Sequence, residues 1–180
     1  MNILSRFLRE RQAGANAILG VVILLCGMMM VMLLLEIGRL YVIAEKVQND
    51  LDSSNAATWA VIDRSSIARG VLQFHSSSES RTTGVNRSRA KFTEYLRKNL
   101  ELDTSLNPID PDKFIAGPVT IQRYEVYLAS DLPLTNTDGI YVNKVSVYSK
   151  INVPVKLMFP MFGETYQLTV KRVTNLEDDL

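Results

Sequence analysis

An apolar segment without any charged residue or histidine stands near the start of the chain, from Gln12 to Leu35. A helix of this length spans roughly 36 Å at a rise of about 1.5 Å per residue. The hydrocarbon core of a bilayer is about 30 Å thick, so such a helix crosses it with some tilt. The segment therefore predicts a transmembrane helix, which we place at residues 15–35.

Beyond this segment the helical pattern continues, but only one face remains apolar. No proline interrupts residues 36–75, and apolar residues recur there near helical spacing. These residues are Leu40, Ala44, Val47, Leu51, Trp59 and Ile62. We expect one helical rod from about residue 15 to about residue 74, whose second part lies outside the membrane and packs on a following domain. Ser53–Asn55 and Gly70 are the positions at which this rod could break.

Residues 76–180 have the pattern of an α+β domain. A polar loop is expected over Ser76–Gly84, followed by a short amphipathic helix over Ser88–Leu100. Asn107–Asp112 has the composition of a turn. From Gly117 onward the hydrophobic period changes from that of a helix to two, which predicts strands.

Three strands follow from this alternation. The first, Val119–Leu128, alternates imperfectly, which indicates a β-bulge. The clearest strand, Lys144–Phe159, has its apolar residues at odd positions, so one face should be buried and the other wet. Pro154 within it lacks an amide donor and should face a sheet edge or a bulge. After a turn at Pro160–Gly163, a last strand runs over Thr165–Lys171, and the short connections imply an antiparallel sheet.

The charge distribution predicts how the chain is oriented in the membrane. Arg6, Arg9 and Arg11 precede the apolar segment, with only Glu10 against them. Because basic residues beside a span remain cytoplasmic, we expect the N-terminus inside and the C-terminal domain outside a single-pass protein of the cytoplasmic membrane. A removable secretory signal is the alternative, although no small-x-small cleavage site follows the segment. The formal net charge of +1 argues against a nucleic-acid partner.

The sequence carries no signature of an enzyme. The single cysteine, Cys26, lies in the apolar segment, and His75 is the single histidine, so one chain offers neither a disulfide nor two imidazoles. Gly-rich phosphate loops and Gly-x-Ser-x-Gly are absent, and we expect no catalytic residue, cofactor or metal. Oxygen ligands for Ca²⁺ exist in one polar cluster, Asp103, Asn107, Asp110 and Asp112. This cluster lacks the spacing of a calcium loop, and we interpret it as turn-forming residues.

Three residues mark the end of the apolar segment: Glu36, Arg39 and Tyr41. Glu36 and Arg39 are three positions apart and therefore share a helix face. One interpretation is an ion pair at the membrane interface, with Arg39 reaching the headgroups. The other is a pair with neighbouring subunits in a helix bundle. Tyr41 would lie at headgroup level as an aromatic anchor.

Residues 33–60 resemble the TadE-like family of tight-adherence pilus proteins, which are type IV pilin-like. The resemblance is carried by Glu36, Gly38, Arg39, Tyr41, Gln48, Asn49, Ala56 and Ala57. The end of the chain also fits the family plan, with the long strand of Lys144–Phe159, Pro160, Gly163 and a last strand within Thr165–Glu177. The resemblance implies a pilin-like fold. It also implies a role as a pilin, minor pilin or pseudopilin in a surface filament for adhesion, or in its assembly machinery.

The same resemblance implies processing and partners. Prepilins are cut by a membrane aspartic peptidase, which here points to cleavage between Gly14 and Ala15, with residues 1–14 as a basic leader. Position five of the mature chain is then Leu19, where pilins usually have glutamate, so the salt bridge to a neighbour's freed amine is missing. The implied partners are the prepilin peptidase, other pilin-like subunits through the N-terminal helix, and an assembly platform and ATPase on other chains. The alternative is an uncleaved single-span anchor carrying an extracytoplasmic binding domain in a secretion or conjugation envelope complex.

Overall fold

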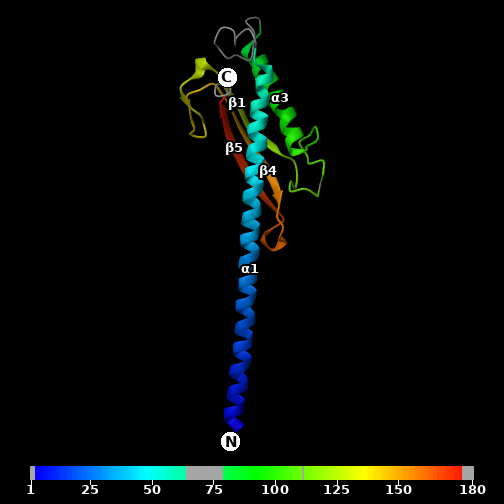
Figure 1. The fold of residues 1–180 in the computed structure, drawn as a ribbon, viewed down its shortest axis with the longest axis vertical. Coiled ribbons are helices and arrows are strands. Elements are labelled where there is room, and N and C mark those ends of the chain that lie inside the picture. Colours follow the sequence, from blue (N-terminus) through cyan, green and yellow to red (C-terminus); the bar gives the residue numbers. More distant parts are fainter. Residues whose placement is uncertain (1–2, 64–78, 111, 176–180) are drawn as a thin grey trace. The chain divides into compact units, whose positions relative to one another are not determined.

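The computed structural model describes residues 3–63, 79–110 and 112–175, with side chains from Asn16 onward (Figure 1). The chain is α+β, with a long N-terminal helix and a small antiparallel sheet, as predicted. It divides into two compact units, one up to Tyr41 and one that begins at Val42. We call them the apolar-helix unit and the sheet unit.

Helix α1 is continuous from Ile3 to Ala56, so it belongs to both units. The predicted rod was too long, because the 3₁₀-helix η1, Ala57–Val61, follows at once and Ile62 is extended. Side-chain hydroxyls compete for the carbonyls of the last turns: Ser54 Oγ donates to the Asp50 carbonyl at 2.6 Å. The helix therefore ends beside the polar Ser53–Asn55 segment. The rest of the expected rod, with Gly70, lies outside the described residues.

Helix α3, Arg81–Leu100, begins seven residues before the predicted Ser88. Its N-cap is Ser80, whose Oγ accepts a hydrogen bond from the Thr83 amide at 3.2 Å. This cap satisfies an otherwise free amide at the start of the helix. The predicted loop is therefore wrong over Arg81–Gly84, which are helical, whereas Ser76–Ser78 lie outside the described residues. The buried face of the helix consists of Gly84, Ser88, Phe92, Leu96 and Leu100.

The main sheet has three antiparallel strands in the order β1-β4-β5. Their bounds are Thr120–Tyr127 for β1, Ser146–Lys156 for β4 and Thr165–Asn175 for β5. The predicted bulge is confirmed, because the register of β1 shifts between Ile121 and Arg123. Two short strands, β2 at Leu134–Thr135 and β3 at Tyr141–Val142, form a separate hairpin, and single 3₁₀ turns lie at Ala129–Asp131 and Pro160–Phe162.

The central strand β4 carries the core of the sheet unit. The predicted alternation is confirmed within β4 by buried Val147, Ile151, Val153 and Val155, and Val145 is buried just before it. The strand is shorter than the predicted Lys144–Phe159, and Leu157 and Phe159 lie beyond its end. Pro154 causes no loss in the ladder, because β1 pairs only as far as Asn152. Beyond that point an irregular segment runs beside β4, and the Pro154 carbonyl accepts from the Ala116 amide at 2.7 Å. The side of Pro154 that lacks a donor thus lies past the end of β1.

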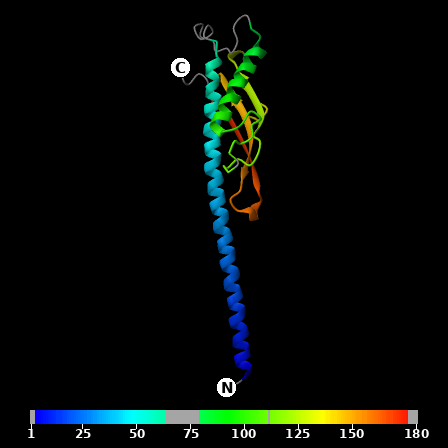
Figure 2. The same cartoon turned by 90° about the vertical axis from the view of Figure 1, so that its right-hand side faces the viewer.

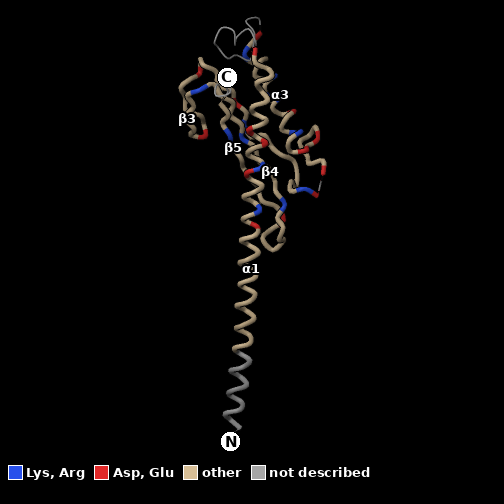
Figure 3. The backbone as a smooth tube through the Cα atoms, viewed as in Figure 1, with Lys and Arg blue, Asp and Glu red and all other residues tan. Residues whose placement is uncertain are grey.

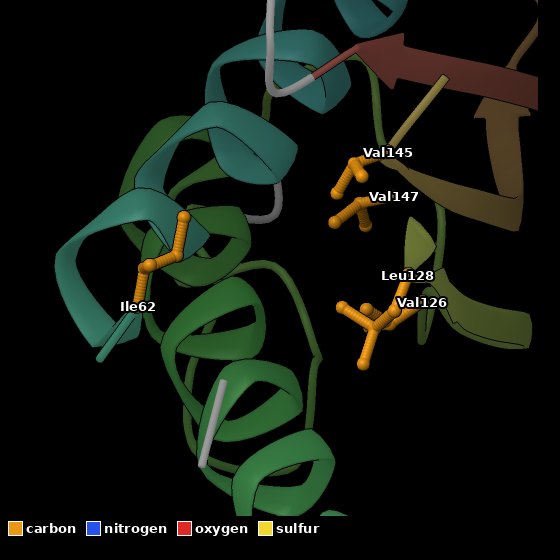
Figure 4. Close-up of a cluster of buried hydrophobic side chains, with 5 residues drawn as sticks. All are labelled: Ile62, Val126, Leu128, Val145 and Val147. Carbon is orange, nitrogen blue, oxygen red and sulfur yellow. The ribbon is translucent and has the colours of Figure 1, made fainter. Parts of the chain in front are cut away.

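Helices α1 and α3 cover one face of this sheet (Figure 2). Val47 and Leu51 of α1 are fully buried there, and Asn55 Nδ2 donates to Thr174 Oγ1 of β5 at 3.0 Å. Between the helices, Asn99 Nδ2 donates to the Asp50 carbonyl at 3.2 Å. Figure 4 shows part of the resulting core, in which Ile62, after η1, lies across from side chains of β1 and β4.

The opposite face of the sheet is more buried than the alternation of β4 predicts. Tyr148 occupies an even position of β4 and yet is fully buried, with Tyr127 and Val142 beside it. The β2–β3 hairpin contributes Leu134 and Ile140 to this second cluster. The preceding β2–β3 hairpin thus covers a position that the period of β4 alone assigns to water.

Candidate functional site

The apolar half of α1 exposes its side chains in every direction. Among the described residues from Asn16 to Leu35 none is buried, and Figure 3 shows this stretch without a charged residue. In the described part of the chain, one helix is long and apolar enough to cross a membrane, and it begins near the N-terminus. A Cβ built on Gly20, Gly27 or Gly38 meets no other atom within 4 Å. These glycines therefore leave the helix surface open to a close neighbour.

At the end of this surface, the structure brings together two of the three predicted residues. Arg39 Nη1 lies 3.1 Å from Glu36 Oε1, which confirms the predicted shared helix face. Glu36 is 3% exposed, whereas Tyr41 is 73% exposed. The carboxylate is thus held by a guanidinium of its own chain, and Tyr41 presents its ring to the surroundings.

The candidate cleavage site lies in helical backbone. Gly14 and Ala15 are both within α1, and their side chains are outside the described part of the structure. Leu19, one turn further on, exposes an apolar side chain. The bond between Gly14 and Ala15 is therefore bracketed by helix on both sides, and a protease needs that helix to open locally.

A polar cluster that the sequence did not predict lies on the hairpin side of the sheet. Asp138, in the β2–β3 turn, receives three donors: Tyr148 Oη at 2.5 Å, Lys150 Nζ at 2.8 Å and Arg123 Nη1 at 3.3 Å. These hydrogen bonds, first that of Lys150, hold the pKa of the Asp138 carboxyl well below its usual range. The cluster fastens the β2–β3 hairpin to β4 and β1.

The lowered pKa of Asp138 should make the stability of the sheet unit depend on pH in the acid range. A carboxyl whose folded pKa is lowered stabilises the fold above its unfolded pKa of about 3.9, and this contribution is lost as pH falls through the folded value. In Asp138→Asn, unfolding in urea should therefore need less denaturant at pH 7 and depend less on pH between pH 5 and pH 2. Asp112→Asn, at an exposed loop aspartate, is the matched control. Equal acid dependence of both variants would contradict a role for the Asp138 cluster.

The residues weighed as calcium ligands serve as turn formers. Asp103 Oδ1 accepts from the amides of Asn107 and Ser105 at 2.9 and 2.8 Å, and these hydrogen bonds, first that of Asn107, lower the pKa of Asp103. Asp110 Oδ1 likewise accepts from the Asp112 amide at 2.9 Å. In the part of the chain that the structure describes, no group of three or more His, Cys, Asp or Glu side chains is placed to hold a metal ion. His75 lies outside that part.

No protein-family model, curated protein or solved structure matches the chain. The likeness of residues 33–60 to TadE-like pilus proteins accordingly rests on those residues themselves.

Proposed function

We propose that this protein is a TadE-like pilin, minor pilin or pseudopilin: a structural subunit of a type IV-like surface filament or of the machinery that assembles it. The observation that carries the proposal is the division of α1. One half of the helix exposes apolar side chains all round, and the other half forms the core of an α+β domain. Apolar area costs about 25 cal/mol per Å² in water, so the exposed half requires lipid or other helices around it.

Assembly then proceeds by an exchange of surroundings. The apolar half of α1 holds the subunit in the cytoplasmic membrane, with the N-terminus inside and the sheet unit outside. A platform and an ATPase on other chains extract it, and the apolar halves of many subunits bury one another in the filament. Packing of small residues drives such association, and Gly20 and Gly27 leave room for it.

The residues at the end of the apolar half of α1 set its depth relative to neighbouring helices and to the lipid headgroups. An ion pair at the edge of lipid is costly to misplace, so Glu36 and Arg39 fix the depth at which neighbouring helices stop. Tyr41, with its exposed ring, marks the headgroup level before assembly.

A second candidate, the uncleaved membrane anchor of an envelope complex, is favoured by Leu19. A pilin with glutamate there has a carboxylate for the neighbour's new amine, whereas Leu19 offers only an apolar surface. In this alternative the chain keeps residues 1–14, remains in the membrane and forms no filament.

Mass spectrometry of the intact protein and N-terminal sequencing, on membrane and sheared surface fractions of the native cell, decide between the two. We expect a chain that starts at Ala15 and appears in the surface fraction. Gly14→Leu should abolish this processing, because the peptidase requires a small residue before the cut, while Gly20→Leu is the matched control that leaves it intact. Full-length protein confined to the membrane fraction would instead support the anchor.

A further inference from the structure

The turn between β4 and β5 presents an apolar surface that the core does not use. This hairpin tip, Leu157–Tyr166, contains no charged residue before Glu164. Met158 and Met161 are 57% and 59% exposed, and the Tyr166 ring is exposed as well. Phe159 and Phe162 pack edge to face on each other, with ring centroids 6.4 Å apart.

The hairpin tip holds a larger share of the exposed apolar residues than any other segment of the sheet unit that the structure describes. In the described part of the unit, the large exposed ones are Val42, Ile109, Tyr141, Met158, Met161 and Tyr166. Half of them belong to the hairpin tip, and Val42 is the residue at which α1 enters the unit. A concentration of this kind, unlike single exposed residues, indicates a contact surface.

Contacts along the unit show toward which end of α1 the hairpin tip extends. Near the end of α1, Asp52 Oδ2 lies 2.8 Å from Arg172 Nε of β5. Nearer its entry, Lys46 lies over the Phe114 ring, and the Phe114 carbonyl accepts from the Lys156 amide at the end of β4. The hairpin thus runs beside α1 toward Val42.

Because a strand rises more per residue than a helix, the hairpin tip extends past the end of the sheet unit at which Val42 lies. A strand rises about 3.3 Å per residue and a helix about 1.5 Å, so nine residues of β5 extend about 30 Å while nine of α1 extend about 14 Å. The ordered turn at Pro160–Phe162 closes the strands there. The tip therefore projects past the end of the sheet unit at which Val42 lies.

We propose that the hairpin tip inserts into the headgroup and upper acyl layer of the bilayer that α1 spans, as a second membrane contact of the subunit. This inference rests on the membrane insertion in the proposed function. The composition fits a lipid interface: methionine and aromatic side chains supply apolar area, and Tyr166 adds a polar tip suited to headgroups.

Probe accessibility in the full-length protein tests the inference. Single cysteines at Met161 and, as the matched control, at exposed Tyr141 are made in a Cys26→Ala background and labelled with an environment-sensitive fluorophore. The protein is reconstituted in vesicles of phosphatidylethanolamine and phosphatidylglycerol. Since interfacial segments lie about 5–10 Å below the headgroup boundary, lipids with a shallow nitroxide should quench the Met161 probe several-fold more than the Tyr141 probe. Aqueous iodide should quench the Tyr141 probe more than the Met161 probe. A probe at Met158→Cys should give the same result as the probe at Met161→Cys.

Labelled wild-type Cys26 separates the two proposals. If the Cys26 probe is deep in lipid while the Met161 probe is open to iodide, the hairpin tip inference is overturned and the membrane span stands. If the Met161 probe is shielded from both iodide and lipid, protein covers the tip, and the inference also fails. If the Cys26 probe itself is open to iodide, the chain does not span the bilayer, and both proposals fall.

Discussion

Replacement of Phe92 by alanine is expected to lower the free energy of unfolding of the sheet unit by about 3–5 kcal/mol. Phe92 is fully buried, and its ring lies 4.9 Å from that of Tyr124, centroid to centroid. The Tyr124 hydroxyl is in turn hydrogen-bonded to Ser88, one turn earlier on α3. Truncation therefore leaves a cavity between α3 and β1 and removes the ring that positions Tyr124. Urea unfolding followed by the fluorescence of Trp59, the one tryptophan, measures the change.

Asn86→Ala is the matched control on the same helix. Asn86 is exposed, and alanine is the better helix former, so its effect should remain within about 0.5 kcal/mol. If Phe92→Ala costs no more than this control, α3 does not close the core in the way described.

The paired change Val22→Asp and Leu25→Asp is expected to abolish membrane retention. Two carboxylates near the centre of a span cost about 5–7 kcal/mol, whereas each Leu, Ile or Val contributes only about 0.3–0.6 kcal/mol toward insertion. The two positions share one exposed face of α1. Alkaline carbonate extraction of cell membranes, followed by detection of the protein in pellet and supernatant, measures retention.

The same two positions changed to alanine provide the control, since alanine removes volume without adding charge. That variant should remain in the pellet. An aspartate pair that stays fully membrane-bound would show that the apolar half of α1 is not what holds the protein there. At an ordinary exposed surface in water, the pair would change stability by only about 0.5 kcal/mol per residue.

The hydrophobic period within a single element was enough to predict features that depend on that element alone. The odd-numbered valines of β4 and the bulge of β1 follow from alternation within one strand, and the Glu36–Arg39 pair follows from helical spacing. The helix boundaries were predicted less well, because hydrogen bonds of single hydroxyls decided them. Ser80 starts α3 early, and Ser54 lies where α1 ends.

Features made by contacts between separate elements could not be predicted from the period of one element. Tyr148 is buried by a hairpin that the alternation of β4 does not reveal, and Asp138 meets Arg123 and Lys150 only once β1, β4 and the β2–β3 hairpin are assembled. Polar residues at the even positions of β4 were the available signal for that cluster. Of the candidate site, the exposed apolar surface and Tyr41 were foreseeable from composition, whereas cleavage after Gly14 depends on a second protein.

The bonds between α1 and β5 join two elements that are far apart in the sequence, with α1 made well before β5. Asn55 and Thr174 are 119 residues apart, and Asp52 accepts from Thr174 across 122 residues. At about 5–20 residues per second, synthesis of the intervening chain takes roughly 6–24 s. During this interval the apolar half of α1 is available to the insertion machinery while β5, the partner of the other half, does not yet exist. Under the proposed membrane insertion, α1 thus has a head start over folding, and the sheet unit closes only after β5 has been made.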